Sequence, residues 1–325
     1  MASSIEVAPP RAGATEGSQA KVATTARLTR RERRKDPRRV VVRALAIMAL
    51  LTVALFFIIP VVWLLLAPTK TDTQLVNSSP FAFGSLSQVT KTWHNLYQFE
   101  SGAILVWIRN SAIYSGAAVL LAVAVSIPAG YGLAVTRFIG RKALLIITLI
   151  VMLVPSNAVV LPLFLGMSDV HLIGNALSVI LPFAFFPFGV YLSYIYFSTT
   201  IPNDLLAAAR VDGCSEWKTF RYVAVPLATP VIGLVAFFNF VANWNNFFLP
   251  FVMLPQTNQF TASVGLENLL SSSPAFNPGA GGQDLSVLRP EVALGVLLTI
   301  APVMLVFLFA QRTLVKGLLA GATKG

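Results

Sequence analysis

Charged residues are scarce in this chain. Asp, Glu, Lys and Arg make up 11% of its 325 residues, whereas an average globular domain contains about 25%. Hydrophobic residues make up 56% of the chain, and the mean hydropathy is +0.73. This composition excludes a disordered chain and most soluble enzymes. It predicts an integral membrane protein with several spans.

Cysteine and histidine are nearly absent. The single cysteine, Cys214, cannot form a disulfide within the chain, which excludes a disulfide-stapled module and gives no information on the redox compartment. The two histidines, His94 and His171, lie between the apolar runs. An intramembrane hydrolase needs a nucleophile with a base, or a bound metal. We therefore expect no catalytic residue and no metal site.

Six apolar stretches are long enough to cross a bilayer core, which takes about 20 helical residues. None of them contains Asp, Glu, Lys, Arg or His. They cover approximately residues 44–67, 111–135, 143–167, 175–197, 228–254 and 292–310. The predicted fold class is an all-α polytopic membrane protein with six transmembrane helices. A secondary carrier would need intramembrane ionisable groups or evident inverted repeats, and neither is evident.

The positive charge gathers on one side of these spans. The two terminal segments and the loops 136–142 and 198–225 hold 20 of the 24 Lys and Arg, with seven of the 13 Asp and Glu. The positive-inside rule places these segments, and hence both termini, in the cytoplasm. The connections 68–110 and 255–289 then lie outside, and the second shows few helix or strand signals. The predicted location is the plasma or inner membrane.

Three regions are predicted along the chain. Residues 1–43 form a basic, disordered cytoplasmic tail, residues 44–311 the transmembrane domain, and residues 312–325 a second cytoplasmic tail. The basic run within residues 30–39 fits anionic lipid at the membrane surface, with a nucleic-acid arm as the alternative. The first apolar run is no secretory signal, because it is long and no small-residue cleavage site follows it.

The fifth apolar run carries asparagines on one helical face. Asn239, Asn243 and Asn246 are spaced i, i+4 and i+7, and Trp244 lies beside them. Amides next to aromatic rings suit a neutral polyol, so these four residues are candidates for a substrate pathway. The alternative is that the asparagines only bridge neighbouring helices, as polar side chains often do in membranes.

The loop 202–226 has the local signals of two short helices joined at an elbow. Pro202 suits a helix start. Gly213 breaks that helix, and Ser215 can cap a second one over residues 216–222, which ends at Pro226. Such an elbow can dock into a groove on another protein. A simple interfacial connector is the alternative.

This loop resembles the coupling loop of binding-protein-dependent ABC importer permeases. The family pattern is Glu-Ala-Ala, three residues, Gly, nine residues and Ile-x-Leu-Pro. Ala207-Ala208-Ala209, Gly213 and Val223-Ala224-Val225-Pro226 match its spacing, although Ala207 replaces the usual glutamate. The resemblance implies contact with an ATPase subunit through Asp204, Ala207, Ala208, Ala209, Asp212, Gly213 and Pro226.

A wider similarity extends from about residue 44 to the end. Pro162-Leu-Phe-Leu, Asn243-Trp-Asn-Asn-Phe-Phe and the ending from Gln311 are similar to the maltose-type sugar permeases, and in particular to their six-span partner subunit. This similarity implies the type I ABC importer permease fold. It also implies a second permease subunit, two cytoplasmic ATPase subunits and an extracytoplasmic sugar-binding protein as partners. The tail would then reach the ATPase subunits through Lys316, Gly317, Gly321 and Lys324.

No Gly-x4-Gly-Lys-Ser/Thr phosphate loop occurs in the chain. ATP and Mg²⁺ are therefore expected on a partner chain, and this chain is expected to hold no cofactor and to bind no nucleic acid. The predicted function is the permease subunit of an ATP-driven sugar importer. Spans without charge favour a neutral solute. The alternatives are a permease for glycerol phosphate or a polyamine, a non-ABC secondary carrier, and a purely structural subunit.

Overall fold

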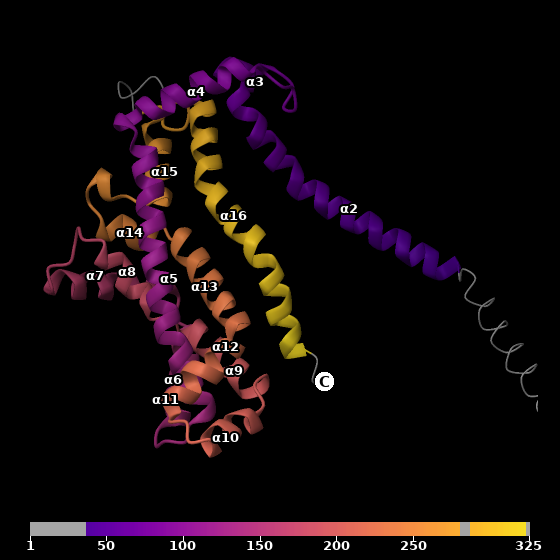
Figure 1. The fold of residues 1–325 in the computed structure, drawn as a ribbon. Helices are drawn as coiled ribbons and strands as arrows, with labels where there is room; N and C mark the ends of the chain where they lie inside the picture. The colour runs from indigo at the N-terminus through magenta and orange to yellow at the C-terminus, as the bar shows by residue number, and fades with distance from the viewer. Residues whose placement is uncertain (1–36, 280–286, 323–325) are drawn as a thin grey trace, which may run out of the picture. The chain divides into compact units, whose positions relative to one another are not determined.

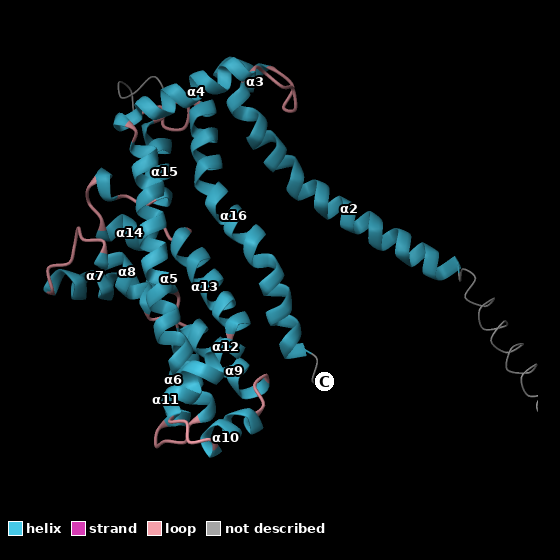
Figure 2. Ribbon diagram, viewed as in Figure 1, coloured by secondary structure: helices cyan, strands magenta, loops and turns pink. Residues whose placement is uncertain are grey.

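The structure of the chain, a computed structural model, describes residues 37–279 and 287–322. Within these ranges the elements are helices joined by turns, without a strand (Figure 2). The all-α fold predicted from the sequence is therefore confirmed. Most of the predicted amino-terminal tail, residues 1–36, lies outside the described residues.

The chain contains four long helices and a larger number of short ones within the described residues (Figure 1). The long helices are α2 (Pro37–Leu66), α5 (Ala103–Val135), α13 (Thr229–Trp244) and α16 (Arg289–Ala322). The shorter ones are α3 (Asp72–Asn77), α4 (Leu86–Gln98), α6 (Arg141–Met152), α7 (Val160–Asp169), α8 (Leu177–Ala184), α9 (Pro187–Thr199), α10 (Asn203–Val211), α11 (Glu216–Thr219), α12 (Val225–Leu227), α14 (Phe248–Met253) and α15 (Ala262–Ser272).

Several of these helices can cross a membrane. In the described part of the chain, four stretches are long and apolar enough: Val41–Thr69, Ala103–Val135, Leu177–Thr199 and Arg289–Gln311. Two further pairs of helices pass the same test together but are sharply bent. If each bent pair counts as one span, the total is six, as predicted.

The third predicted span, residues 143–167, is not a continuous helix. It consists of α6 and a second segment, Ser156–Asp169, which meet at an angle of 101°. Pro155 lies at the break, and a proline disfavours helical backbone in the residue before it. The helix consequently ends before Pro155 and starts again in a new direction after it.

The fifth predicted span, residues 228–254, is also interrupted. Helix α13 ends at Trp244, and α14 begins only at Phe248. The Oδ1 atom of Asn246 accepts a hydrogen bond from the backbone N–H of Leu249 at 3.1 Å. An asparagine side chain that binds backbone two or three residues ahead favours a turn over a continued helix.

The connections 68–110 and 255–289 both contain helices, although the sequence shows few helix signals in the second. They contain α3, α4 and α15. Each of these helices has a side-chain cap at its first turn, from Thr71, Ser85 and Thr261 respectively. Such caps satisfy the free N–H groups of a short helix, and this local signal outweighs the loop-like composition around it.

The chain divides into two compact units, one ending at Val62 and one beginning at Trp63. In the first unit, α2 is apolar, and none of its best spanning window is buried inside the protein. A helix that is apolar on every side is typical of a membrane-spanning helix surrounded by lipid or by other protein.

Helix α5 is central to the second unit, where it packs along α9 and α13, and α16 packs on α13. Gly130 permits the close approach of α5 and α9, because a Cβ there would lie 2.3 Å from the Cβ of Ser193. Figure 1 shows α3, α4 and α15 at one end of this unit and α10 and α11 at the other. We call these the cap end and the elbow end.

Candidate functional site

The predicted elbow is present at residues 202–227. Helix α10 starts directly after Pro202, and the chain then turns at Gly213, whose φ is +79°. An L-residue with a side chain adopts this backbone region only at a cost, so glycine suits the turn. The Ser215 hydroxyl caps α11 by accepting a hydrogen bond from the N–H of Lys218 at 3.4 Å. The predicted start, break and cap are thus confirmed.

The inner face of the elbow is anchored in the core. Leu206, Phe220 and Ala224 are at most 8% exposed and pack in one cluster with residues of α5, α9 and α13. The ring of Phe220 lies 5.0 Å, centroid to centroid, from the ring of Tyr131 on α5. Tyr131 in turn contacts Phe197 of α9 edge-to-face at 5.4 Å. The elbow is therefore packed through these rings against α5 and α9.

An ion pair joins the two short helices. Arg210 Nε and Nη2 donate to the two carboxylate oxygens of Glu216 at 2.7 and 3.2 Å. The hydrogen bond from the Arg210 guanidinium lowers the pKa of Glu216 below its usual value. Arg210 also interacts electrostatically with the Tyr131 hydroxyl. Sequence analysis missed this pair, although the six-residue separation across a glycine turn is its visible signal.

The outer face of the elbow is exposed. Of the predicted contact residues, only Ala209 is buried, while the others lie at the surface: Asp204, Ala207, Ala208, Asp212, Gly213 and Pro226. Large apolar side chains stand among them. Val211 is 87% exposed and Trp217 63% exposed. The elbow therefore presents an apolar surface that nothing in the described chain covers.

The second half of the elbow differs from its prediction. The α-helix over residues 216–222 gives way after Thr219 to a π-type turn, Phe220–Ala224, and then to α12. Pro226 lies in the first turn of α12 and does not end it, since a proline is tolerated there. The bend of 76° comes at Ala228, between α12 and α13. The Tyr196 hydroxyl of α9 donates to the Leu227 carbonyl at 2.9 Å, which holds this bend.

Asn239 faces the neighbouring helix pair. Its Nδ2 donates to the carbonyl oxygen of Phe183 at 3.0 Å. In a regular helix that carbonyl would accept the N–H four residues later, but the residue there is Pro187, which has none. Asn239 thus supplies the donor that the break between α8 and α9 lacks. The side chain is fully buried.

The other pathway candidates also contact neighbouring helices or turns. Asn243 Oδ1 accepts from the Ser115 hydroxyl of α5 at 2.7 Å. The indole Nε1 of Trp244 donates to the Thr299 carbonyl of α16 at 3.0 Å. Asn246 is half-buried and ends the turn before α14. These contacts favour the helix-bridging role that the sequence analysis left open for the asparagines.

Helix α16 extends well beyond the predicted last span. It runs from Arg289 to Ala322, so the backbone of Lys316, Gly317 and Gly321 continues the same helix. Lys324 lies outside the described residues. The cap end of α16 is fixed by Arg289, which pairs with Asp72 at 2.8 Å, and by Glu291, which accepts from Asn95 Nδ2 at 3.0 Å.

The chain is similar to known transport proteins over most of its length. It is 31% identical over 293 residues to the arabinooligosaccharides transport system permease protein AraQ of Bacillus subtilis (strain 168), covering 90% of this chain and 99% of that one. It is 28% identical to the lactose transport system permease protein LacG of Rhizobium radiobacter, covering 83% and 93%.

The fold has a solved counterpart. A crystal structure of a bacterial ABC transporter involved in the import of the acidic polysaccharide alginate matches with a TM-score of 0.71 at 21% identity, covering 86% of this chain and 97% of the other. The family model for the binding-protein-dependent transport system inner membrane component matches residues 126–319, which include the elbow and the end of α5 that it contacts. The chain therefore belongs to this family of multi-pass ABC importer permeases, and it is a transport subunit rather than an enzyme.

Proposed function

We propose that this chain forms half of the translocation pathway of an ATP-driven sugar importer and is coupled to a separate ATPase through residues 202–226. Membership of the family implies other ABC components as partners. The composition that we propose is a second permease subunit, two cytoplasmic ATPase subunits that bind ATP and Mg²⁺, and an extracytoplasmic sugar-binding protein.

The observation that carries this proposal is the two-sided elbow. Its inner side chains are buried among the long helices, whereas Val211, Trp217 and Tyr222 are 87, 63 and 69% exposed on its outer side. Clustered apolar side chains on an exposed helical segment mark a protein-binding surface. Docking of such a segment in a groove buries them.

The elbow is also built to transmit movement. Closure of the ATPase pair would push on the outer face, and Phe220 would pass that displacement to Tyr131 on α5. The bond between Tyr196 and the Leu227 carbonyl couples α9 to the entry of α13. Rigid helices that rotate as units in this way can alternate access to a central site.

The orientation that we propose places the elbow end in the cytoplasm. The turn 136–140 and the first residues of α6, Arg141 and Lys142, lie at the same end of the second unit as α10 and α11 (Figure 1). Residues 136–142 and the elbow, residues 202–226, hold three Lys and Arg each. By the positive-inside rule both then face the cytoplasm, with the two chain termini on the same side.

The solute that we propose is a neutral sugar or oligosaccharide. The named relatives transport arabinooligosaccharides and lactose, and the apolar spans carry no ionisable side chain at their centres. We place the pathway near the break between α13 and α14, where Asn246 is half-buried and Phe247 and Phe248 are exposed. Asn243 and Trp244 lie in the last turn of α13 before this break and bond to Ser115 of α5 and Thr299 of α16, whereas Asn239 bonds to Phe183 of α8. We also propose that residues 312–325 reach the ATPase subunits.

Co-purification with the ATPase subunit of the same importer tests the coupling role. Val211→Asp and Trp217→Ala remove apolar surface from the outer face of the elbow, so the ATPase should dissociate from both variants. Phe276→Asp is the matched control, because Phe276 is also exposed and apolar (53%) but lies near α15 at the cap end. Retention of the ATPase by both elbow variants would contradict the assignment and favour a purely structural subunit.

Uptake in proteoliposomes that contain all partners tests the solute. We expect ATP-dependent accumulation of a labelled arabinooligosaccharide or lactose, and none of glycerol phosphate or spermidine. Accumulation of either charged solute would leave the coupling role intact and contradict the sugar assignment. Accumulation that follows an ion gradient without ATP would instead indicate a secondary carrier.

A further inference from the structure

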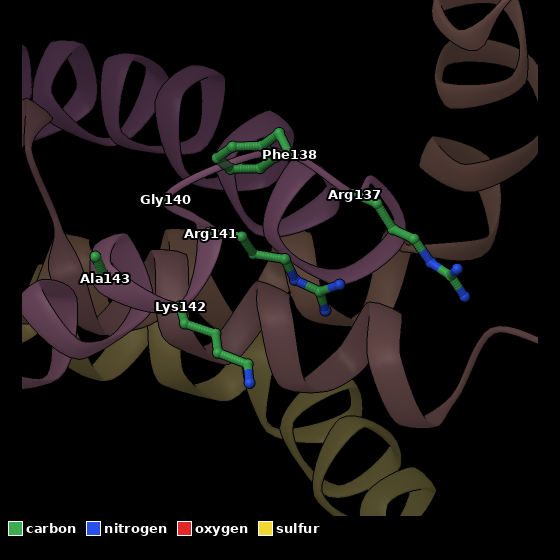
Figure 3. A pocket seen from close by; sticks show the side chains of 6 residues that line it. All are labelled: Arg137, Phe138, Gly140, Arg141, Lys142 and Ala143. Atoms are coloured by element: carbon green, nitrogen blue, oxygen red, sulfur yellow. The ribbon is translucent and has the colours of Figure 1, made fainter.

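A hollow of about 340 Å³ lies at the elbow end, where α5 turns into α6. It is lined by six consecutive or near-consecutive residues: Arg137, Phe138, Gly140, Arg141, Lys142 and Ala143 (Figure 3). In this view the Arg141 guanidinium and the Lys142 ammonium extend to the same side of the turn, away from the Phe138 ring. The hollow is therefore open and strongly basic.

The cations in this hollow form no ion pair with a carboxylate of the described residues. No Asp or Glu occurs anywhere between Glu100 and Asp169 in the sequence. Among residues 37–279 and 287–322, the ion pairs found involve Arg210 and Arg289 instead. Three positive charges lie close together in this turn, so an anion that enters the hollow is attracted to all of them.

Arg141 is held in a fixed position in the hollow. Its Nη2 donates to the Ala134 carbonyl at 3.2 Å and its Nη1 to the Thr136 carbonyl at 3.4 Å. These acceptors belong to the last turn of α5, where carbonyl groups have no helical partner. They orient the guanidinium without cancelling its charge. Arg137 and Lys142 are exposed on either side of it.

The surroundings of the hollow are apolar. Ile139, at the tip of the turn, is fully exposed, and Phe138 is 43% exposed. Helix α6 begins two residues later and exposes Leu144, Ile146 and Ile147 in its first two turns. Cations directly beside an exposed apolar helix lie where a spanning segment meets the lipid headgroups. A soluble anion gains nothing from the apolar flank, whereas a lipid contacts both parts.

We propose that this hollow binds the phosphate of an anionic phospholipid in the leaflet at the elbow end. Arg141 and Lys142 face the phosphate, Arg137 closes the other side of the hollow, and Phe138 and Ile139 insert among the adjoining acyl chains. Basic pockets beside membrane helices bind anionic headgroups by this combination of charge and apolar contact.

Photolabelling tests this site on the full-length protein reconstituted in vesicles. The probe is phosphatidylglycerol with a photoreactive group on its acyl chain, in a background of phosphatidylcholine, and labelled peptides are identified by mass spectrometry. We expect labelling of residues 138–147 by this probe to exceed labelling by the corresponding phosphatidylcholine. Each cation near an anionic surface strengthens binding roughly fivefold, so Arg137→Gln with Lys142→Gln should reduce the labelling roughly tenfold or more.

Two controls separate the outcomes. Lys218→Gln with Arg221→Gln removes the same charge from the elbow end outside the hollow, and it should leave the labelling unchanged. Arg137→Lys with Lys142→Arg keeps the charge and should retain the labelling. The proposal fails if the phosphatidylglycerol and phosphatidylcholine probes label residues 138–147 equally. It fails as well if the variant with Arg137→Gln and Lys142→Gln is labelled as strongly as the parent, provided that its thermal unfolding transition shows it to be folded. It also fails if inorganic phosphate abolishes the labelling, because the hollow would then be a site for free anions.

Discussion

Arg210 and Glu216 form a two-pronged ion pair across the turn at Gly213, with N–O distances of 2.7 and 3.2 Å. The two side chains are 40 and 56% exposed. Exposed pairs stabilise a protein by at most about 1 kcal/mol. We therefore expect the pair to set the angle between α10 and α11 and to add little to the stability of the fold.

Breaking the pair should impair coupling and leave folding intact. For Arg210→Gln we expect a thermal unfolding temperature close to that of the parent, because the ion pair is exposed. ATP-driven uptake in proteoliposomes should fall several-fold relative to ATP hydrolysis. The ratio of solute transported to ATP hydrolysed is the quantity to measure.

The reversed pair, Arg210→Glu with Glu216→Arg, is the matched test of this interaction. This double variant should recover part of the ratio of solute transported to ATP hydrolysed, which either single substitution should lower. Because Arg210 lowers the pKa of Glu216, the pair should persist above the ordinary carboxylate range and be lost only as the pH falls below it. An equal loss in the single and reversed variants would show that the pair does not set the elbow angle.

Two glycines of α5 should respond oppositely to alanine. A Cβ at Gly130 would lie 2.3 Å from the Cβ of Ser193, whereas a Cβ at Gly132 meets nothing within 4 Å. Gly130→Ala should separate α5 from α9 and lower the unfolding temperature, with a cost of about 1–3 kcal/mol typical of overpacking. Gly132→Ala should be neutral or stabilise by up to about 1 kcal/mol. Equal effects would contradict the close packing of α5 and α9.

The elbow could be predicted from the sequence because its signals are local. Pro202, Gly213 and Ser215 each act on the backbone within a few residues. The partner of Arg210 and the burial of Phe220 against Tyr131 could not be predicted in the same way. They depend on where α5 lies, and nothing in the loop itself encodes that position.

Removing the amide of Asn239 should destabilise the break between α8 and α9. Asn239→Leu leaves the Phe183 carbonyl without its donor. The cost of a buried, unpaired carbonyl is about 1–3 kcal/mol. The Oδ1 atom of Asn239 has no hydrogen-bond partner in the described part of the chain, so removing this buried acceptor offsets part of that cost. We therefore expect the free energy of unfolding to fall by about 1 kcal/mol. Thermal unfolding in detergent measures it.

Asn245→Leu is the control for this change, because Asn245 is one of the exposed residues after α13. A lower unfolding temperature for the Asn245 variant than for the Asn239 variant would contradict the bridging role. Asn243→Leu addresses the pathway: unchanged transport by a normally assembled complex would remove Asn243 from contact with the solute.

The breaks in the spans could not be predicted from the positions of the prolines alone. Pro60, Pro128 and Pro302 lie inside continuous helices, whereas Pro155 and Pro187 follow breaks. A proline removes one N–H at every such position. Whether the helix bends or breaks depends on donors from other helices, as Asn239 shows for Phe183. That information comes from the packed fold.

Glu291 should stabilise the cap end. It is 3% exposed and accepts hydrogen bonds from Asn95 Nδ2 and from the Leu288 N–H, each at 3.0 Å. Glu291→Leu removes the acceptor of the half-buried Asn95 amide and of the half-buried Leu288 N–H, a loss of about 0.5–1.5 kcal/mol for each hydrogen bond. We expect a clear drop in unfolding temperature, against almost none for Glu267→Leu, whose side chain is exposed. Similar drops would show that the Glu291 contacts contribute little.

The central claim is that the elbow couples ATP hydrolysis to transport, and Gly213 tests it most directly. Its φ of +79° costs a residue with a side chain about 1–2 kcal/mol, whereas asparagine tolerates this region. ATP hydrolysis and solute uptake should be measured together in proteoliposomes that contain all partners. We predict that Gly213→Val loses most ATP-driven uptake and that Gly213→Asn retains much of it. Parental uptake and hydrolysis in the Gly213→Val complex would contradict the coupling role of the elbow.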